Sequence, residues 1–230
     1  MGSVISIIPK IHREGLRFIF LFALVTLILF LIWLPLGWMG LVLTIWCVYF
    51  FRDPERVIPL GKGLVISPAD GVICFVGPAK PPEELEMGEE GWQKISVFMN
   101  VFNCHVNRSP MEGTVLKSVY WPGKFFNASF DKASDENERH SISLSNENVG
   151  VIGVVQIAGL VARRIVCDAE VGTVLNAGER FGIIRFGSRL DVYVKSELSA
   201  RVGLGQTIVG GETILADMAH TGEAQETVTR

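Results

Sequence analysis

The chain has 230 residues, of which 49% are hydrophobic and 20% are charged, and its formal net charge is −3. This composition excludes an intrinsically disordered chain, and without a basic field nucleic-acid binding is not expected as the main function. The four cysteines are far apart and form no Cys-x-x-Cys pair, so neither a zinc site nor a redox dithiol is predicted. The mean hydropathy of +0.36 instead indicates a part of the chain that is made for lipid.

Residues 18–51 carry most of the hydrophobic excess and contain no charged side chain. One straight helix of this length would measure about 50 Å, well beyond the roughly 30 Å of a hydrocarbon core. Pro35 and Gly37 therefore predict a break and a transmembrane helical hairpin. Basic residues flank both ends, which favours the inner cell membrane with the body on the cytoplasmic face. One crossing followed by an interfacial helix is the alternative.

The rest of the chain predicts a mostly β body over residues 63–218, after an anchor and linker over residues 1–62 and before a polar tail over residues 219–230. Short β-rich runs alternate there with Gly, Pro, Asn and Asp. The acidic stretch Pro78–Trp92 predicts a solvated loop. The clearest strands are expected around Val65, 72–76, 94–100, 114–121, 141–144, 151–157, 164–167, 182–185, 190–194 and 207–215.

His105 is the most suggestive of the four histidines, because it lies in a β-rich run with Asn103, Asn107 and Arg108 close by. Histidine is the usual acid or base near neutral pH, although a purely structural histidine is the alternative. Taken alone, Asp70 in SPADG and the dipeptide Gly187-Ser188 are compatible with ordinary turns.

Five motifs taken together give a more specific signal. They follow the membrane segment in the order FFRDPER (50–56), SPADG (67–71), VFNCHVNRSP (101–110), NER (137–139) and FGSR (186–189). This series resembles the phosphatidylserine decarboxylase family, in its short bacterial and archaeal branch, from about Arg52 to Met218. The resemblance implies a compact body, similar to a β-barrel or β-sandwich, that is built from two interwoven chains.

The resemblance also implies a proenzyme that cleaves itself between Gly187 and Ser188. The products would be a β chain, residues 1–187, and an α chain, residues 188–230, that begins with a pyruvoyl group made from Ser188. This group would form a Schiff base with phosphatidylserine, release CO₂ and leave phosphatidylethanolamine, with no pyridoxal phosphate and no metal. The expected partners are the serine phospholipid, the membrane and the chain's own two fragments, and a second copy of the chain is a further candidate.

Each motif residue then receives a role. Ser188 Oγ would attack the Gly187 carbonyl, and His105 would be the base, held by the Asp70 carboxylate as in a serine triad. His105 would also protonate the carbanion that remains when CO₂ leaves. The long form of the family carries a second histidine three positions after the first, where this chain has Arg108. The usual division between two histidines therefore cannot be transferred.

Arg108 and Arg139 are candidates for binding the lipid phosphate or the serine carboxylate, with surface ion pairs as the alternative. Asn103 and Asn137 complete the candidate substrate-binding residues. Two other functions stay open. One is a biotinyl- or lipoyl-type carrier module, for which Lys195 is the only lysine between Gly178 and Met218. The other is a membrane-tethered β domain with a scaffolding role and no self-cleavage.

Overall fold

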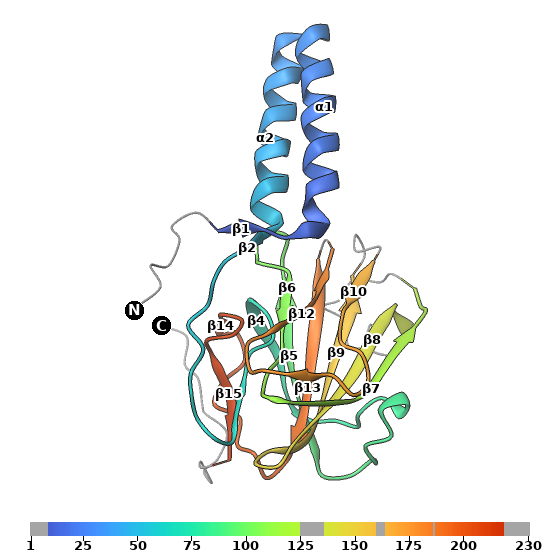
Figure 1. Cartoon of the computed structure of the whole chain (residues 1–230), viewed down its shortest axis with the longest axis vertical. Helices are drawn as coiled ribbons and strands as arrows, with labels where there is room; N and C mark the ends of the chain where they lie inside the picture. The colour runs from blue at the N-terminus through green and yellow to red at the C-terminus, as the bar shows by residue number, and fades with distance from the viewer. Residues whose placement is uncertain (1–8, 125–135, 160–163, 186, 219–230) are drawn as a thin grey trace. The chain divides into compact units, whose positions relative to one another are not determined.

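The computed structural model describes residues 9–124, 136–159, 164–185 and 187–218. The chain divides into two compact units, residues 1–55 and residues 56–230. The first unit contains two long helices and a two-stranded sheet, and the second contains the remaining strands (Figure 1).

The N-terminal unit is a hairpin of two helices. α1 (Leu16–Ile32) follows a short 3-10 helix, η1 (Arg13–Gly15), and α2 (Leu34–Phe50) begins after an extended residue, Trp33. The sequence predicts a break at Pro35 and Gly37, and in the structure the break lies just before them, at Trp33. Proline's fixed φ suits the first turn of a helix, so Pro35 starts α2 instead of ending α1. At the base, β1 (Lys10–Ile11) pairs with β2 (Arg52–Asp53).

Small and polar residues hold the two helices together. Gly37 lies within α2, where a Cβ would overlap the ring of Phe30 on α1. A Cβ on Gly40 would lie 2.8 Å from the hydroxyl oxygen of Thr26 on α1. The Thr26 and Thr44 hydroxyls are hydrogen-bonded to each other at 2.9 Å. Close backbone approach at glycine and internally satisfied hydroxyls are features that allow helices to pack in lipid.

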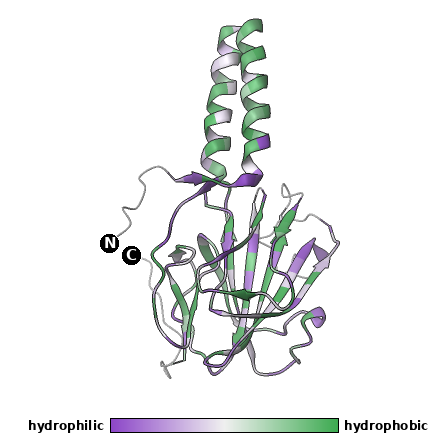
Figure 2. Ribbon diagram, in the orientation of Figure 1, coloured by the Kyte–Doolittle hydropathy of each residue, from purple (hydrophilic) through white to green (hydrophobic). Residues whose placement is uncertain are grey.

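The outward faces of the helices are apolar almost throughout (Figure 2). Phe20 and Leu31, for example, are 71% and 82% exposed. Among the described residues, the helical stretch Arg13–Ile32 is long and apolar enough to cross a membrane, whereas α2 is shorter at 17 residues. An apolar surface that protein does not cover suits a lipid environment, so the unit is suited to membrane anchoring.

An eight-stranded antiparallel sheet forms the centre of the second unit (Figure 1). β13 lies between β9 and β5, and all of its residues except the last are buried. The strands are, in spatial order, β11 (Val174–Leu175), β7 (Gly113–Trp121), β8 (Arg139–Asn146), β9 (Gly150–Ala158), β13 (Ser188–Lys195), β5 (Trp92–Met99), β4 (Gly71–Pro78) and β14 (Thr207–Ile208).

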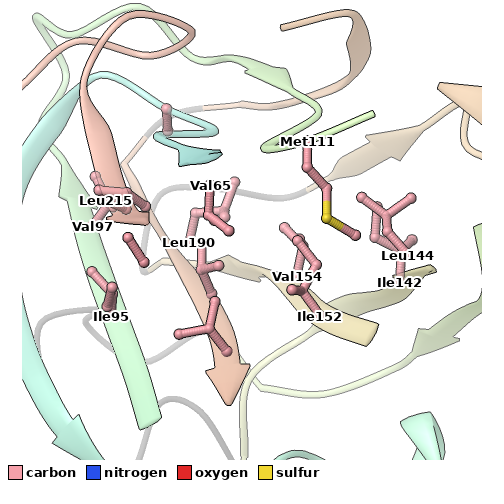
Figure 3. Close-up of a cluster of buried hydrophobic side chains, with 14 of the residues drawn as sticks. Val65, Ile95, Val97, Met111, Ile142, Leu144, Ile152, Val154, Leu190 and Leu215 are labelled. Carbon is pink, nitrogen blue, oxygen red and sulfur yellow. The ribbon is translucent and has the colours of Figure 1, made fainter. Parts of the chain in front are cut away.

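Smaller sheets contribute to a common core with one face of this sheet. Figure 3 shows Val65 and Leu215, from the covering strands, in the same cluster as Leu190 of β13. The covering elements are the three-stranded sheet β10 (Ile165–Cys167), β12 (Arg180–Ile184) and β6 (Val106–Arg108), and the pair β15 (Ile214–Asp217) and β3 (Leu64–Ile66). A further 3-10 helix, η2 (Glu83–Leu85), lies between β4 and β5.

The mostly β class is confirmed, but the barrel form of the prediction is wrong. Within the described residues, β11 and β14 are the two edges of the large sheet and do not pair with each other, so the sheet stays open. The strand predicted over 207–215 is in fact two strands, β14 and β15, which pair with different sheets. Gly211, with φ +81°, lies in the turn between them and allows the chain to change direction.

Candidate active site

Ser188 and Gly187 lie where the chain enters β13. Ser188 is fully buried and pairs with Met99 on β5 and with Ala158 on β9. Its hydroxyl lies 3.9 Å from the Met99 sulfur. Gly187 has φ +68°, a left-handed backbone conformation that residues with a Cβ rarely adopt. The peptide bond between the two residues therefore lies between a left-handed turn that suits glycine and a strand that is paired on both sides.

His105 contacts this dipeptide directly. Its Nε2 accepts a hydrogen bond from the Gly187 N–H at 3.3 Å, although the two residues are 82 positions apart. Because Nε2 is an acceptor, the neutral ring carries its proton on Nδ1, which lies 3.1 Å from the Asn103 carbonyl oxygen. The imidazole is wholly buried, and its basic nitrogen faces the residue that precedes Ser188.

The Gly187 carbonyl oxygen also has a defined partner. It accepts a hydrogen bond from the Gly159 N–H at 3.1 Å. Gly159 directly follows β9, and Ala158 before it is the β9 partner of Ser188. A backbone donor in this position can stabilise negative charge that develops on the oxygen when the carbonyl is attacked. No sequence motif marks Gly159, since its role depends only on strand register.

Asp70 has partners other than the one predicted. Its carboxylate accepts two hydrogen bonds from Arg56, at 2.9 and 2.7 Å, and a third from the Gly210 N–H at 2.8 Å. The His105 nitrogens instead contact Asn103 and Gly187. The structure therefore connects the first two motifs through the Arg56–Asp70 ion pair, and a backbone carbonyl orients the histidine.

Three predicted binding residues make hydrogen bonds that shape the backbone around the site. The Asn103 side chain accepts a hydrogen bond from the Asn100 N–H at 2.8 Å, in the turn that leads to His105. Arg108 donates to the Gly178 carbonyl at 2.9 Å, and Asn137 donates to the Ala158 carbonyl at 2.8 Å. Asn103 and Asn137 thus support the two segments that contact the dipeptide, His105 and the end of β9.

Arg139 lies on the opposite face of the sheet from Ser188. It pairs with Ile157, whereas Ser188 pairs with the adjacent Ala158, and successive residues of a strand point to opposite faces. Arg139 makes a buried ion pair with Glu84 at 2.7 Å and borders a cavity of about 570 Å³. The structure therefore does not bring Arg139 together with the dipeptide.

Glu84 departs from the prediction of a solvated loop over Pro78–Trp92. Its side chain is only 7% exposed, whereas that of Glu83 is 90% exposed. Burial alone would raise the pKa of Glu84. Hydrogen bonds from Arg139, the local backbone and Ser141 outweigh this effect and hold the pKa below its ordinary value of 4.5. This contact attaches the loop to the sheet.

Comparison with known proteins identifies the family. The family model described as phosphatidylserine decarboxylase matches residues 43–216. A phosphatidylserine decarboxylase proenzyme from Cereibacter sphaeroides is 57% identical over 94% of this chain and 93% of its own length. A proenzyme of the same description from Ruegeria pomeroyi is 55% identical over 93% of this chain and 97% of its own. The chain belongs to the phosphatidylserine decarboxylase family.

Family membership confirms the resemblance seen in the five motifs and the expectation of a decarboxylase proenzyme that acts in phospholipid biosynthesis. It argues against the two alternative functions, a carrier module and a scaffolding domain. Lys195, the residue on which a carrier depended, ends β13, and its ammonium lies 3.9 Å from the centre of the Trp92 ring.

The Glu84–Arg139 pair predicts a pH-dependent contribution to stability. Because the folded pKa of Glu84 is lowered, its carboxylate stabilises the fold above pH 4.5, and this contribution is lost as the pH falls through the folded value. Glu84→Gln should lower the free energy of unfolding by about 1–3 kcal/mol at pH 7 and by less in acid. Thermal unfolding of the detergent-solubilised chain at several pH values measures this, with Glu83→Gln as an exposed control. A Glu84→Gln deficit that does not change with pH would contradict the assignment.

Proposed function

We propose that this chain cleaves itself between Gly187 and Ser188 and then decarboxylates phosphatidylserine to phosphatidylethanolamine. The contact between His105 Nε2 and the Gly187 N–H is the observation that carries the proposal. A basic nitrogen therefore contacts the residue that precedes a buried serine, in a family whose relatives are described as proenzymes.

Self-cleavage begins with attack of Ser188 Oγ on the Gly187 carbonyl carbon, which exchanges the peptide bond for an ester. Elimination then removes the Cα hydrogen of residue 188 as a proton and breaks the bond between its Cβ and Oγ, leaving Gly187 with a free carboxylate and residue 188 as dehydroalanine. Hydrolysis of the dehydroalanine releases ammonia and leaves a carbonyl on the α carbon. The Gly159 N–H stabilises the oxyanion formed in the first step, and glycine at position 187 adopts the positive φ of this turn without a steric penalty.

His105 is the base for this attack. Its Nε2 takes the Ser188 proton, and Nδ1–H keeps its hydrogen bond to the Asn103 carbonyl while the ring is charged. Because Nε2 accepts the Gly187 N–H, this nitrogen carries no proton in the structure, as the role of a base requires. After maturation the same nitrogen can return a proton to the substrate carbon from which CO₂ has left.

The surroundings of residue 188 fit a pyruvoyl group, which occupies the same α, β and carbonyl carbons as the serine it replaces. The position is buried from water, and uncharged polar side chains and a sulfur atom lie around it. A pyruvoyl group there would supply a carbonyl that binds the substrate amine and accepts the electron pair left by CO₂.

The fragments produced by this cleavage would be interwoven. The α chain, residues 188–230, carries β13, β14 and β15, and β13 lies between two strands of the β chain. Hydrogen bonds on both of its edges keep the new amino terminus in place when the peptide bond before it is broken.

Both helices of the N-terminal unit are proposed to cross the membrane, with the body on the cytoplasmic face. Their apolar surfaces and the basic residues at both ends of the hairpin support this arrangement.

Self-cleavage is tested by Ser188→Ala and His105→Ala. Ser188→Ala removes the attacking oxygen, so the variant should remain a single chain of 230 residues. His105→Ala should slow cleavage by about 10²- to 10⁴-fold, because the proton has no acceptor. Denaturing electrophoresis and intact mass measure both outcomes. An active wild-type protein that is a single uncleaved chain would falsify the proposal.

Asp70→Asn in the same assay tests the predicted triad. If Asp70 holds His105, this variant should resemble His105→Ala. If Asp70 acts only through Arg56 and Gly210, as its hydrogen bonds indicate, Asp70→Asn and Arg56→Gln should show the same milder defect.

The oxyanion role of Gly159 is tested by Gly159→Pro, which removes the donating N–H. Ala158 lies in a strand, a conformation that is compatible with a following proline. Self-cleavage should slow by about 10²- to 10³-fold. Gly159→Ala keeps the N–H and is the matched control. A folded Gly159→Pro variant that cleaves at the wild-type rate would show that the hydrogen bond is dispensable.

The two-crossing topology predicts that a reporter fused after Arg230 is cytoplasmic. Alkaline phosphatase in that position should be inactive and green fluorescent protein should fluoresce, because both ends of a helical hairpin lie on the same side. Active phosphatase would instead indicate one crossing.

A further inference from the structure

A pair of buried amides lies close to Ser188. Gln156 on β9 donates from Nε2 to Asn107 Oδ1 at 2.8 Å, and Asn107 on β6 donates from Nδ2 to the Met99 sulfur at 3.9 Å. The same sulfur accepts the Ser188 hydroxyl at 3.9 Å. Both amides are at most 1% exposed. The pair thus connects the large sheet to its covering sheet at the reaction centre.

The register of the sheet places Gln156 on the same face as Ser188. Gln156 pairs with Leu190 and Ala158 pairs with Ser188, so Gln156 and Ser188 are diagonal neighbours across β9 and β13. Side chains in this relation are within reach when one of them is long.

One atom of the pair has no hydrogen-bond partner in the part of the chain that the structure describes. The NH₂ group of Gln156 faces two acceptors, Asn107 Oδ1 and the Val166 carbonyl at 3.5 Å, and this determines the orientation of the amide. Gln156 Oε1 must therefore point away from both. It is buried and has no hydrogen-bond partner among the described residues. An unsatisfied buried acceptor is costly, and it indicates a donor that arrives with a ligand.

The chemistry of the headgroup identifies that donor. The phosphate and the carboxylate of a serine phospholipid are anionic acceptors, which a carbonyl oxygen repels. The primary amine alone carries N–H groups, and it is also the group that must reach the α carbon of residue 188. We propose that Gln156 Oε1 accepts a hydrogen bond from the substrate amine and directs its nitrogen toward residue 188. This inference rests on the proposed pyruvoyl chemistry and adds a substrate-binding residue to it.

The test uses Gln156→Met, which keeps the length of the side chain but removes the acceptor. Vesicles of phosphatidylethanolamine are the first probe, because this lipid shares the amine and the phosphate but lacks the carboxylate. Cyanoborohydride reduces the C=N bond formed between the amine and the carbonyl, and the mass of the α chain then reports the adduct. Gln156→Met should mature normally and form this adduct about 10- to 100-fold more slowly than wild type. Phosphatidylserine should show the same loss.

Three controls separate this role from a structural one. Borohydride without lipid should reduce the carbonyl of residue 188 equally fast in Gln156→Met and wild type. Gln156→Glu should restore much of the adduct, because a buried, protonated carboxyl can donate to Asn107 and accept from the amine. Gln93→Met replaces an amide near the other end of the sheet, where Gln93 donates to the Leu198 carbonyl, and should have no effect.

Equal losses with the two lipids support the inference. A loss with phosphatidylserine alone would overturn it, because the contact would then depend on the carboxylate. Uncleaved precursor in both Gln156 variants would also overturn it, since the amide would then serve maturation. A wild-type α chain without a carbonyl at residue 188 would instead disprove the proposed function, and this inference would fail with it.

Discussion

Hydrogen bonds along both edges hold β13 in the middle of the large sheet, from Ser188 to Lys195 against β5 and from Ser188 to Tyr193 against β9. This double pairing determines where the first residue of the strand lies, and hence where the dipeptide meets His105. It also makes the proposed cleavage compatible with a stable fold. A break before Ser188 would remove one covalent bond and leave both ladders in place, so the new end would stay between β5 and β9.

Successive side chains of β13 point to opposite faces of the sheet, so uncharged and charged residues lie on different sides. Ser188 and Leu190 face the core shared with the covering sheets, where uncharged polar groups surround the serine. Arg189 and Asp191 face the other side and form a buried ion pair at 2.9 Å. Burying charge is tolerable when it is paired in this way, and the alternation of the strand keeps this ion pair on the other face of the sheet from the Ser188 side chain. Arg189, although part of the FGSR motif, therefore faces away from the Ser188 side chain.

Several sequence motifs are connected by contacts that bridge long stretches of chain. Arg56 holds Asp70, His105 holds Gly187, and Asn137 holds the end of the strand that pairs with Ser188. These contacts bring residues of different motifs together in the folded body. The N-terminal helical hairpin depends on a different kind of contact, the close packing of glycine and hydroxyl residues between two apolar helices.

The sequence by itself determined the features that depend on neighbouring residues. An uncharged apolar run indicated the helical hairpin, alternating patterns and turn residues indicated the β class, and the ordered motifs indicated the family and the Gly187-Ser188 dipeptide. Only the tertiary structure decided the partners: Arg56 rather than His105 for Asp70, the far face for Arg139, and the hydrogen bonds of Gly159 and Gln156. These depend on strand order and register, and a shift of one residue would turn every side chain to the opposite face. Local sequence patterns do not encode strand order and register, because both are determined by packing between segments that are far apart in the chain.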